Sequence, residues 1–144
     1  MASKARTGIR PFLEWLRGCV KREERGILAD LRHGFGPATE HRAWPHLAAW
    51  GVDLTDDRER RIWLTIAAGF ATLQETRRCG NMGATLRRIA GGDLQSFEGR
   101  FRRLLACATV REICDRLPAV IRAARQKGAA IDFEQLFWDL RDWN

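Results

Sequence analysis

The chain has 144 residues, 45% of them hydrophobic, and 25 bases against 18 acids give it a net charge of +7 and a pI near 10.2. This length and apolar content fit one domain or two small lobes and exclude a disordered chain. No apolar run approaches the roughly 20 residues that span a bilayer, and the first residues lack the apolar core of a signal peptide. We therefore expect a soluble, cytoplasmic protein. The positive charge indicates an anionic partner without distinguishing DNA, RNA and an acidic membrane.

The first half of the sequence predicts four helices, because apolar residues recur there at intervals of three and four. Pro11 is tolerated in the first turn of the first helix. The fourth helix has the strongest periodicity, and Asp and Thr residues at 53–57 are suited to cap its amino end. The four predicted helices cover residues 9–20, 23–33, 40–50 and 58–76.

The second half predicts further short helices and no β-strand, since no segment alternates apolar and polar residues. Thr109 and Asp132 are placed to cap two of these helices. Pro118 lacks a backbone N–H and clashes with the preceding turn, so we expect the helix after Thr109 to end or kink at Leu117. The predicted helices cover residues 84–90, 96–108, 110–117, 119–127 and 133–143.

These elements predict an all-α fold of about eight short-to-medium helices. The segment 77–83 is basic and contains two glycines, so it is expected to be a hinge between two small helical-bundle lobes at 8–76 and 84–143. A single core shared by all the helices is the alternative. The hinge could also bring a phosphate close to its backbone, although a connecting role is the commoner meaning of such a segment.

The positive charge is concentrated in one third of the chain. Residues 77–127 hold twelve bases and four acids (+8), residues 1–76 hold twelve bases and ten acids (+2), and residues 128–144 hold one base and four acids (−3). Arginine clustered on one surface is the electrostatic footprint of a nucleic-acid-binding protein. A solvated basic face without a ligand is the alternative interpretation.

The most basic helix, 96–108, has an apolar stripe and arginines on both sides of it. Arg100 and Arg103 fall on one shoulder of the stripe and Arg102 on the other. The stripe that we expect to be buried comprises Phe97, Phe101, Leu104, Leu105 and Ala108. In the preceding short helix, Arg87 and Arg88 are expected to face solvent.

No motif of a nucleotide-binding loop, a hydrolase elbow or a zinc protease is present. The four cysteines and three histidines lack metal-site spacing, and Cys107 and Cys114 are expected to be buried thiols. The acids near residues 53–59 suggest a metal-dependent nuclease only weakly, because helix capping is the ordinary role of such residues. Most of the six tryptophans are expected in the core, with Trp50 and Trp143 exposed and available to stack on bases.

Four blocks of the sequence carry a resemblance to a known family. They are GILADLRHGFGPATEHRAWPHL at 26–47, GNMGATLRRI at 80–89, FEGRFRRLLACA at 97–108 and AAIDFEQLFWDLRDW at 129–143. In this order and spacing they resemble the CasB family, the small subunit of the type I-E CRISPR surveillance complex Cascade. Each block alone is a weak pattern of Leu, Arg and Gly, so the resemblance depends on all four together.

The resemblance implies a non-catalytic, two-subdomain helical protein of antiviral defence, without a cofactor or a small-molecule substrate. Its implied role is to stabilise the R-loop through a basic surface, while guide pairing reads the sequence and a separate helicase–nuclease cuts. The implied partners are the backbone and large subunits of Cascade, a second copy of the chain, crRNA, target DNA and the displaced non-target strand, with no membrane.

The resemblance implies that three arginines lie at the nucleic acid. Arg32 matches the basic residue of the family's L-R-[RH] motif, Arg58 matches the one at the start of its long helix, and Arg100 matches the one in its E-x-R-[FI] motif. The sequence departs from the family at Gly99, Ala84 and Pro118, where basic residues are frequent. Other arginines of the chain are expected to compensate. The full set of candidate nucleic-acid-binding residues is Arg32, Arg58, Arg77, Arg87, Arg88, Arg100, Arg102, Arg103 and Arg122.

The competing hypothesis is a helical scaffold whose arginines meet acidic protein surfaces and never contact nucleic acid. The nucleic-acid hypothesis makes a specific structural prediction. Arginines from separate parts of the sequence should share one surface and should not be paired with the chain's own carboxylates. We expect this of Arg32, Arg58, Arg87, Arg100 and Arg103.

Overall fold

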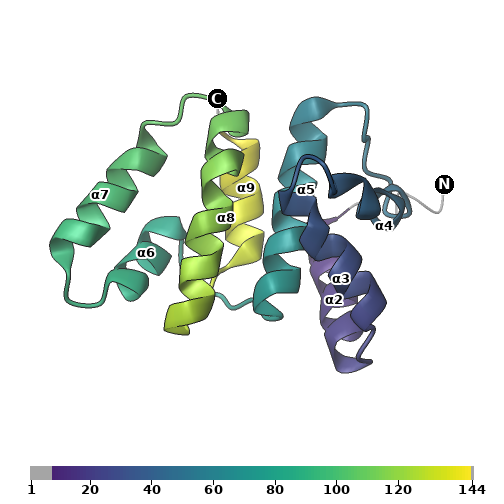
Figure 1. The fold of residues 1–144 in the computed structure, drawn as a ribbon, viewed down its shortest axis with the longest axis horizontal. Helices are drawn as coiled ribbons and strands as arrows, with labels where there is room; N and C mark the ends of the chain where they lie inside the picture. Colours follow the sequence, from purple (N-terminus) through teal and green to yellow (C-terminus); the bar gives the residue numbers. More distant parts are fainter. Residues whose placement is uncertain (1–7, 144) are drawn as a thin grey trace.

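The computed structural model describes residues 8–143, which contain eight α-helices, two short 3-10 helices and no strand (Figure 1). The predicted all-α fold of about eight helices is confirmed. The elements in order are α2 (Ile9–Lys21), α3 (Arg25–Arg32), η1 (His33–Phe35), η2 (Glu40–Arg42), α4 (Trp44–Ala48), α5 (Asp57–Leu73), α6 (Met82–Ala90), α7 (Leu94–Leu105), α8 (Val110–Lys127) and α9 (Phe133–Arg141).

Helix α5 is the centre of the molecule. All ten residues from 62 to 71 are buried, because α3 and η1 pack on one side of the helix and α8 and α9 on the other (Figure 1). Gly69 permits this contact, since a Cβ there would lie 2.7 Å from Cε1 of Phe133 and 3.0 Å from Cδ1 of Ile121. The predicted cap is present, with the Asp56 side chain accepting a hydrogen bond from the amide of Glu59.

The segment after α5 is fastened to the start of α9. The Thr76 hydroxyl donates to the Ile131 carbonyl at 3.2 Å and accepts from the Phe133 amide at 2.9 Å, and the Arg77 amide also donates to Ile131. One apolar cluster includes residues from both sides of this segment. The division into lobes at 8–76 and 84–143 stays a prediction.

The sequence predicts that the helix after Thr109 ends or kinks at Leu117. Helix α8 continues through Pro118 to Lys127, so an end at Leu117 is wrong, and the kink stays a prediction. Pro118 costs one backbone hydrogen bond. The helix continues because Leu117, Val120 and Ile121 are all buried and hold both sides of the proline against the core. Thr109 caps α8 as predicted, by accepting from the Glu112 amide at 3.1 Å.

Helix α7 lies at the outer edge of the molecule, where it packs mainly on α6 (Figure 1). Leu104 is its only buried residue, and Leu105 is 60% exposed. The prediction of a wholly buried apolar stripe is therefore wrong. The amphipathic period identified the helix, but it did not reveal that the molecule covers only part of its apolar face.

Candidate nucleic-acid interface

The bases between residues 78 and 127 have no acidic partners within the described chain. Within residues 8–143, none of the bases from position 78 to position 127 lies within 4.0 Å of a carboxylate oxygen. No carboxylate of the described chain therefore competes with an external anion for these bases. These bases are Arg78, Arg87, Arg88, Arg100, Arg102, Arg103, Arg111, Arg116, Arg122, Arg125 and Lys127.

Two predicted arginines of α7 meet a third from α8 around a surface hollow. Arg100 and Arg103 line it from α7, and Arg116 lines it from α8, above an apolar floor that includes Leu104 and Val120. We call it the α7–α8 hollow. Its one acid is Asp115, whose carboxylate lies 3.8 Å from Nη1 of Arg61. Three guanidinium groups thus border a shallow depression wide enough for an anion.

A second hollow lies on the other flank of α8, toward α3. Arg32 lines it from α3, and Arg122 and Arg125 line it from α8, with Phe35 at its base and no acid in its lining. We call it the α3–α8 hollow. The Arg122 guanidinium carbon stands 5.5 Å from the centre of the Phe35 ring, a cation–π contact that orients the side chain without neutralising it.

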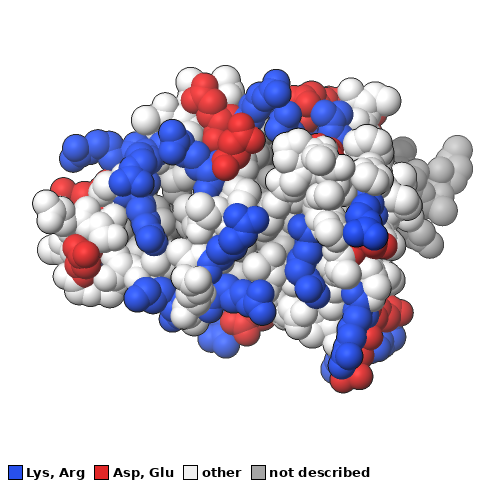
Figure 2. Space-filling view, in the orientation of Figure 1, with Lys and Arg blue, Asp and Glu red and all other residues white. Residues whose placement is uncertain are grey.

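The two hollows open beside the exposed face of α8. Figure 2 shows basic side chains across the face formed by α3, α7 and α8, with most acidic side chains toward the edges of the view. Arg116 and Arg122 are six residues apart, or about 9 Å along the helix axis. Arg32, Arg100, Arg103 and Arg122 are thus gathered around one helix from three separate parts of the sequence.

The remaining predicted residues lie elsewhere. Arg87 stacks over the Phe97 ring at 5.5 Å, and Arg88 donates twice to the Cys79 carbonyl, at 3.2 and 2.6 Å. Arg77 lies 3.5 Å from a carboxylate oxygen of Glu75. Arg102 is exposed on α7 and does not line either hollow.

Arg58 has a structural role that the sequence did not reveal. Its Nη2 donates to the carbonyl oxygens of Leu140, Arg141 and Trp143, at 3.5, 2.5 and 2.7 Å. These carbonyls belong to the last turn of α9 and the residues that follow, which have no partners within the helix. Arg58 is thus free of carboxylates, as expected, but its guanidinium is occupied by the main chain.

Sequence reasoning did not select Arg116 and Arg125, although both line the hollows. The expected break at Pro118 placed Arg116 and Arg122 on separate helices, so their shared helix was not foreseen. Arg122 and Arg125 fall on the same predicted helix, 119–127, at i and i+3, and this spacing could have shown that they are neighbours.

The acids near residues 53–59 are engaged in local structure. Asp56 caps α5, Asp57 pairs with Arg60 and Arg61, and Glu59 pairs with Arg141. The hydrogen bond from Arg61 and the charges of both arginines outweigh the desolvation of Asp57, and they lower its pKa. Residues 8–143 contain no group of three His, Cys, Asp or Glu side chains arranged to hold a metal ion.

The cysteine prediction is confirmed, and the tryptophan prediction is partly wrong. Cys107 and Cys114 are buried free thiols, and burial raises the pKa of Cys114 to about 11. Trp44 and Trp138 are the exposed indoles, whereas Trp50 and Trp143 are only half-buried. No helix within residues 8–143 combines the length and apolar character needed to cross a membrane.

Comparison with known families gives one match. The model of the family described as CRISPR-associated protein Cse2 matches residues 27–144, which is most of the chain. This is the small-subunit family that the four sequence blocks resemble. No curated protein and no solved structure matches the chain.

Proposed function

Because this chain belongs to the CRISPR-associated protein Cse2 family, we propose that it is a non-catalytic subunit of the type I-E CRISPR Cascade complex that stabilises the R-loop. In this role it binds the target DNA and the displaced non-target strand, and it braces the backbone subunits that hold the crRNA. Guide pairing reads the sequence in such complexes, so a protein subunit needs to recognise only the sugar–phosphate backbone.

The observation that carries the proposal is the absence of carboxylate partners for the bases from Arg78 to Lys127 within the described chain. A phosphate that approaches these guanidinium groups breaks no internal ion pair. Arginine also presents a planar fork of donors that matches phosphate oxygens. The binding free energy is therefore not reduced by the loss of existing salt bridges.

The two hollows supply the geometry. A single strand that follows the exposed face of α8 meets Arg100, Arg103 and Arg116 on one flank and Arg122 and Arg125 on the other. Contacts of this kind position a strand without reading its bases. We therefore expect binding that depends strongly on salt and weakly on sequence.

The test reverses charge in one hollow. In the reconstituted complex, Arg100→Glu with Arg103→Glu should weaken R-loop formation and flatten its salt dependence, while circular dichroism shows unchanged helicity. The matched control is Arg10→Glu with Arg17→Glu, which changes the net charge equally at exposed arginines of α2 that already pair with Glu134 and Glu14. Equal salt slopes in the test variant and the wild type would contradict the proposal.

The scaffold hypothesis gives the opposite pattern in the same experiment. If the arginines of the hollows meet acidic protein surfaces, their reversal will weaken assembly before any DNA is added. Nucleic acid will then not compete for them, and double-mutant cycles will couple them to carboxylates of the partner. Measuring assembly and DNA binding separately distinguishes the two functions.

A further inference from the structure

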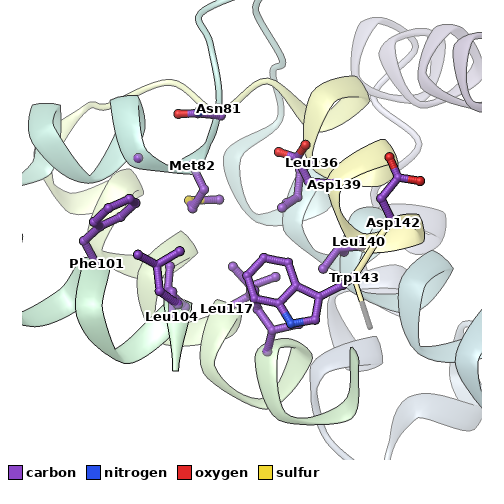
Figure 3. Close-up of a pocket in the computed structure, with 13 residues that line it drawn as sticks. Asn81, Met82, Phe101, Leu104, Leu117, Leu136, Asp139, Leu140, Asp142 and Trp143 are labelled. Atoms are coloured by element: carbon purple, nitrogen blue, oxygen red, sulfur yellow. The ribbon is translucent and has the colours of Figure 1, made fainter. Parts of the chain in front are cut away.

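A third concave feature of the molecule is apolar and lies apart from the arginines. It is a cleft of about 310 Å³ between α7 and α9, with Leu117 of α8 among the residues of its lining. Figure 3 shows Phe101 on the α7 side, Leu136 and Leu140 on the α9 side, and Met82 and Trp143 at its two ends.

The cleft is already formed in the isolated chain. The Trp143 indole nitrogen donates to the Cys107 carbonyl at 2.9 Å, which fixes the ring as one wall. The Phe101 ring stacks on Phe97, with their centroids 5.5 Å apart, which fixes the opposite wall. Leu105 also lines the cleft and remains 60% exposed. An apolar opening with fixed aromatic walls loses little conformational entropy on binding.

The charges near the cleft are opposite in sign to those of the hollows. Asp139 and Asp142 line it, and neither carboxylate lies within 4.0 Å of a base in the described chain. Asp139 accepts only a neutral hydrogen bond, from Nε2 of Gln135 at 2.9 Å. Both acids belong to the one segment of this +7 chain that carries net negative charge. An apolar floor beside unpaired carboxylates repels nucleic acid and suits an apolar segment that carries a base.

We propose that this cleft docks an amphipathic helix of a neighbouring protein subunit. Apolar side chains of that helix enter between α7 and α9, and an arginine or lysine within one turn of them pairs with Asp139 and Asp142. Recognition of a helix in a groove requires this combination of an apolar floor and charges at the rim. The inference rests on the proposed function, because it assigns a protein neighbour in the complex to a cleft whose lining contains no arginine.

Two matched pairs of variants test the proposal. Leu105→Glu places a charge in the cleft, whereas Leu94→Glu makes the same change on the same helix, outside the cleft, at a leucine that is 59% exposed. Asp142→Lys reverses a charge of the cleft, and Glu98→Lys reverses an exposed acid elsewhere on α7. All four changes lie at exposed positions, so folding should be preserved, which thermal unfolding will verify.

The measurement is incorporation of each variant into the complex assembled from purified subunits and guide RNA. Leu105→Glu and Asp142→Lys should each lower the affinity of the chain for the complex about tenfold or more. Leu105→Glu removes a leucine that becomes buried on docking, and Asp142→Lys removes a close charge pair. Their matched controls should assemble like the wild type. Changing the pairing arginine or lysine of the docked helix to glutamate should restore the binding of Asp142→Lys.

The outcomes separate this proposal from the proposed function. Normal incorporation of Leu105→Glu overturns the docking site, whatever the arginine variants do. A photocrosslinker at position 105 that reacts with nucleic acid or with a second copy of the chain also overturns it. Loss of incorporation by the cleft variants, with normal DNA binding by whatever complex still forms, supports the docking site independently of the hollows.

Discussion

The arginines of residues 8–76 and the bases of residues 78–127 differ in their acidic partners, because five of the nine arginines in the first of these segments are paired with a carboxylate. Arg10, Arg17, Arg22, Arg60 and Arg61 each have a carboxylate within 4.0 Å. The bases from 78 to 127 have none within the described residues. A paired arginine is partly neutralised by its carboxylate, whereas unpaired arginines raise the electrostatic potential of a surface and suit the anionic ligand that we propose.

The scarcity of acids among residues 78–127 explains only part of this difference. The four acids of this segment are Asp93, Glu98, Glu112 and Asp115. Asp93 caps α7, Glu112 accepts from the Ala108 amide at 3.0 Å, and Asp115 faces Arg61 of α5. Three of these four carboxylates therefore serve helix ends or the first half of the chain, and Glu98 has no base within 4.0 Å in the described chain. The hollows keep their charge for this reason.

The largest effect should follow from removing arginines from both hollows at once. Replacing four of their arginines by alanine should weaken R-loop binding by the complex about a hundredfold, because four exposed ion pairs at about 0.7 kcal/mol each sum to about 2.8 kcal/mol. The salt slope should fall by about 3, or 0.7–0.9 per lost phosphate contact. Fluorescence anisotropy at several salt concentrations measures both quantities. The substitutions are Arg32→Ala, Arg103→Ala, Arg116→Ala and Arg122→Ala.

Variants of one hollow alone sharpen this prediction. If one strand crosses both hollows, each double variant should give about half of the total loss on a logarithmic scale, since separate sites add. A matched control removes four exposed bases of α2 and α3, at positions 17, 21, 22 and 25. If one hollow accounts for the whole loss, the strand does not cross α8.

The second effect concerns Arg58, which is exposed but bound to the main chain. Arg58→Ala should lower the free energy of unfolding by about 2 kcal/mol, because three carbonyls at the end of α9 lose a charged donor. Arg102→Ala, at an equally exposed arginine without such contacts, should change it by less than about 0.5 kcal/mol. Urea unfolding measures both. If the Arg58→Ala variant has normal stability but impaired DNA binding, Arg58 belongs instead to the nucleic-acid surface that the family resemblance implies.

A smaller effect is expected at Arg60, whose guanidinium donates to the Leu54 carbonyl at 2.8 Å and pairs with Glu40 and Asp57. Arg60→Ala should cost about 1 kcal/mol of stability, because the site is partly buried and its partners remain behind. Arg111→Ala, at an exposed arginine among the bases of residues 78–127, should cause no measurable loss of stability. If both variants lose stability equally, pairing does not distinguish the two regions.

The helices could be predicted from the sequence because their signals are local. Asp56, Thr109 and Asp132 each accept a hydrogen bond from the amide three residues later, as the capping rule expects. The apolar period likewise identified each buried face of α5, α8 and α9. These features depend on neighbours within one or two turns, and such neighbours are visible in the sequence.

The arrangement of the arginines could be predicted only in part. Periodicity placed Arg100 and Arg103 on one side of α7, and in the structure both of them line the α7–α8 hollow. It could not place Arg32 beside Arg122, because that meeting depends on how α3 and α8 pack around α5. Periodicity also could not predict the hydrogen-bond acceptors of Arg58, because these carbonyls lie more than eighty residues away along the chain.

The smallest effect is a pH dependence at Asp57. Its pKa in the folded state lies below the unfolded value of about 3.9, because the hydrogen bond from Arg61 and the charges of Arg60 and Arg61 outweigh desolvation. A lowered folded-state pKa stabilises the protein above the unfolded pKa, and this contribution is lost as the pH falls through the folded value. Asp57→Asn should therefore cost less than about 0.5 kcal/mol at pH 7, since the side chain is 55% exposed, and the difference from the wild type should shrink as the pH falls below the unfolded pKa of about 3.9.

Urea unfolding of the wild type and the variant at pH 7, 5 and 3 measures this gap, and Glu98→Gln is the control on the other half of the molecule. Glu98 lies on α7 among free arginines, and no base lies within 4.0 Å of it in the described chain. Its removal should leave no pH-dependent gap. A gap at Asp57 that widens toward acid pH would mean that its carboxylate is not stabilised by arginine. The carboxylates of the first half would then be no more engaged by bases than Glu98 is.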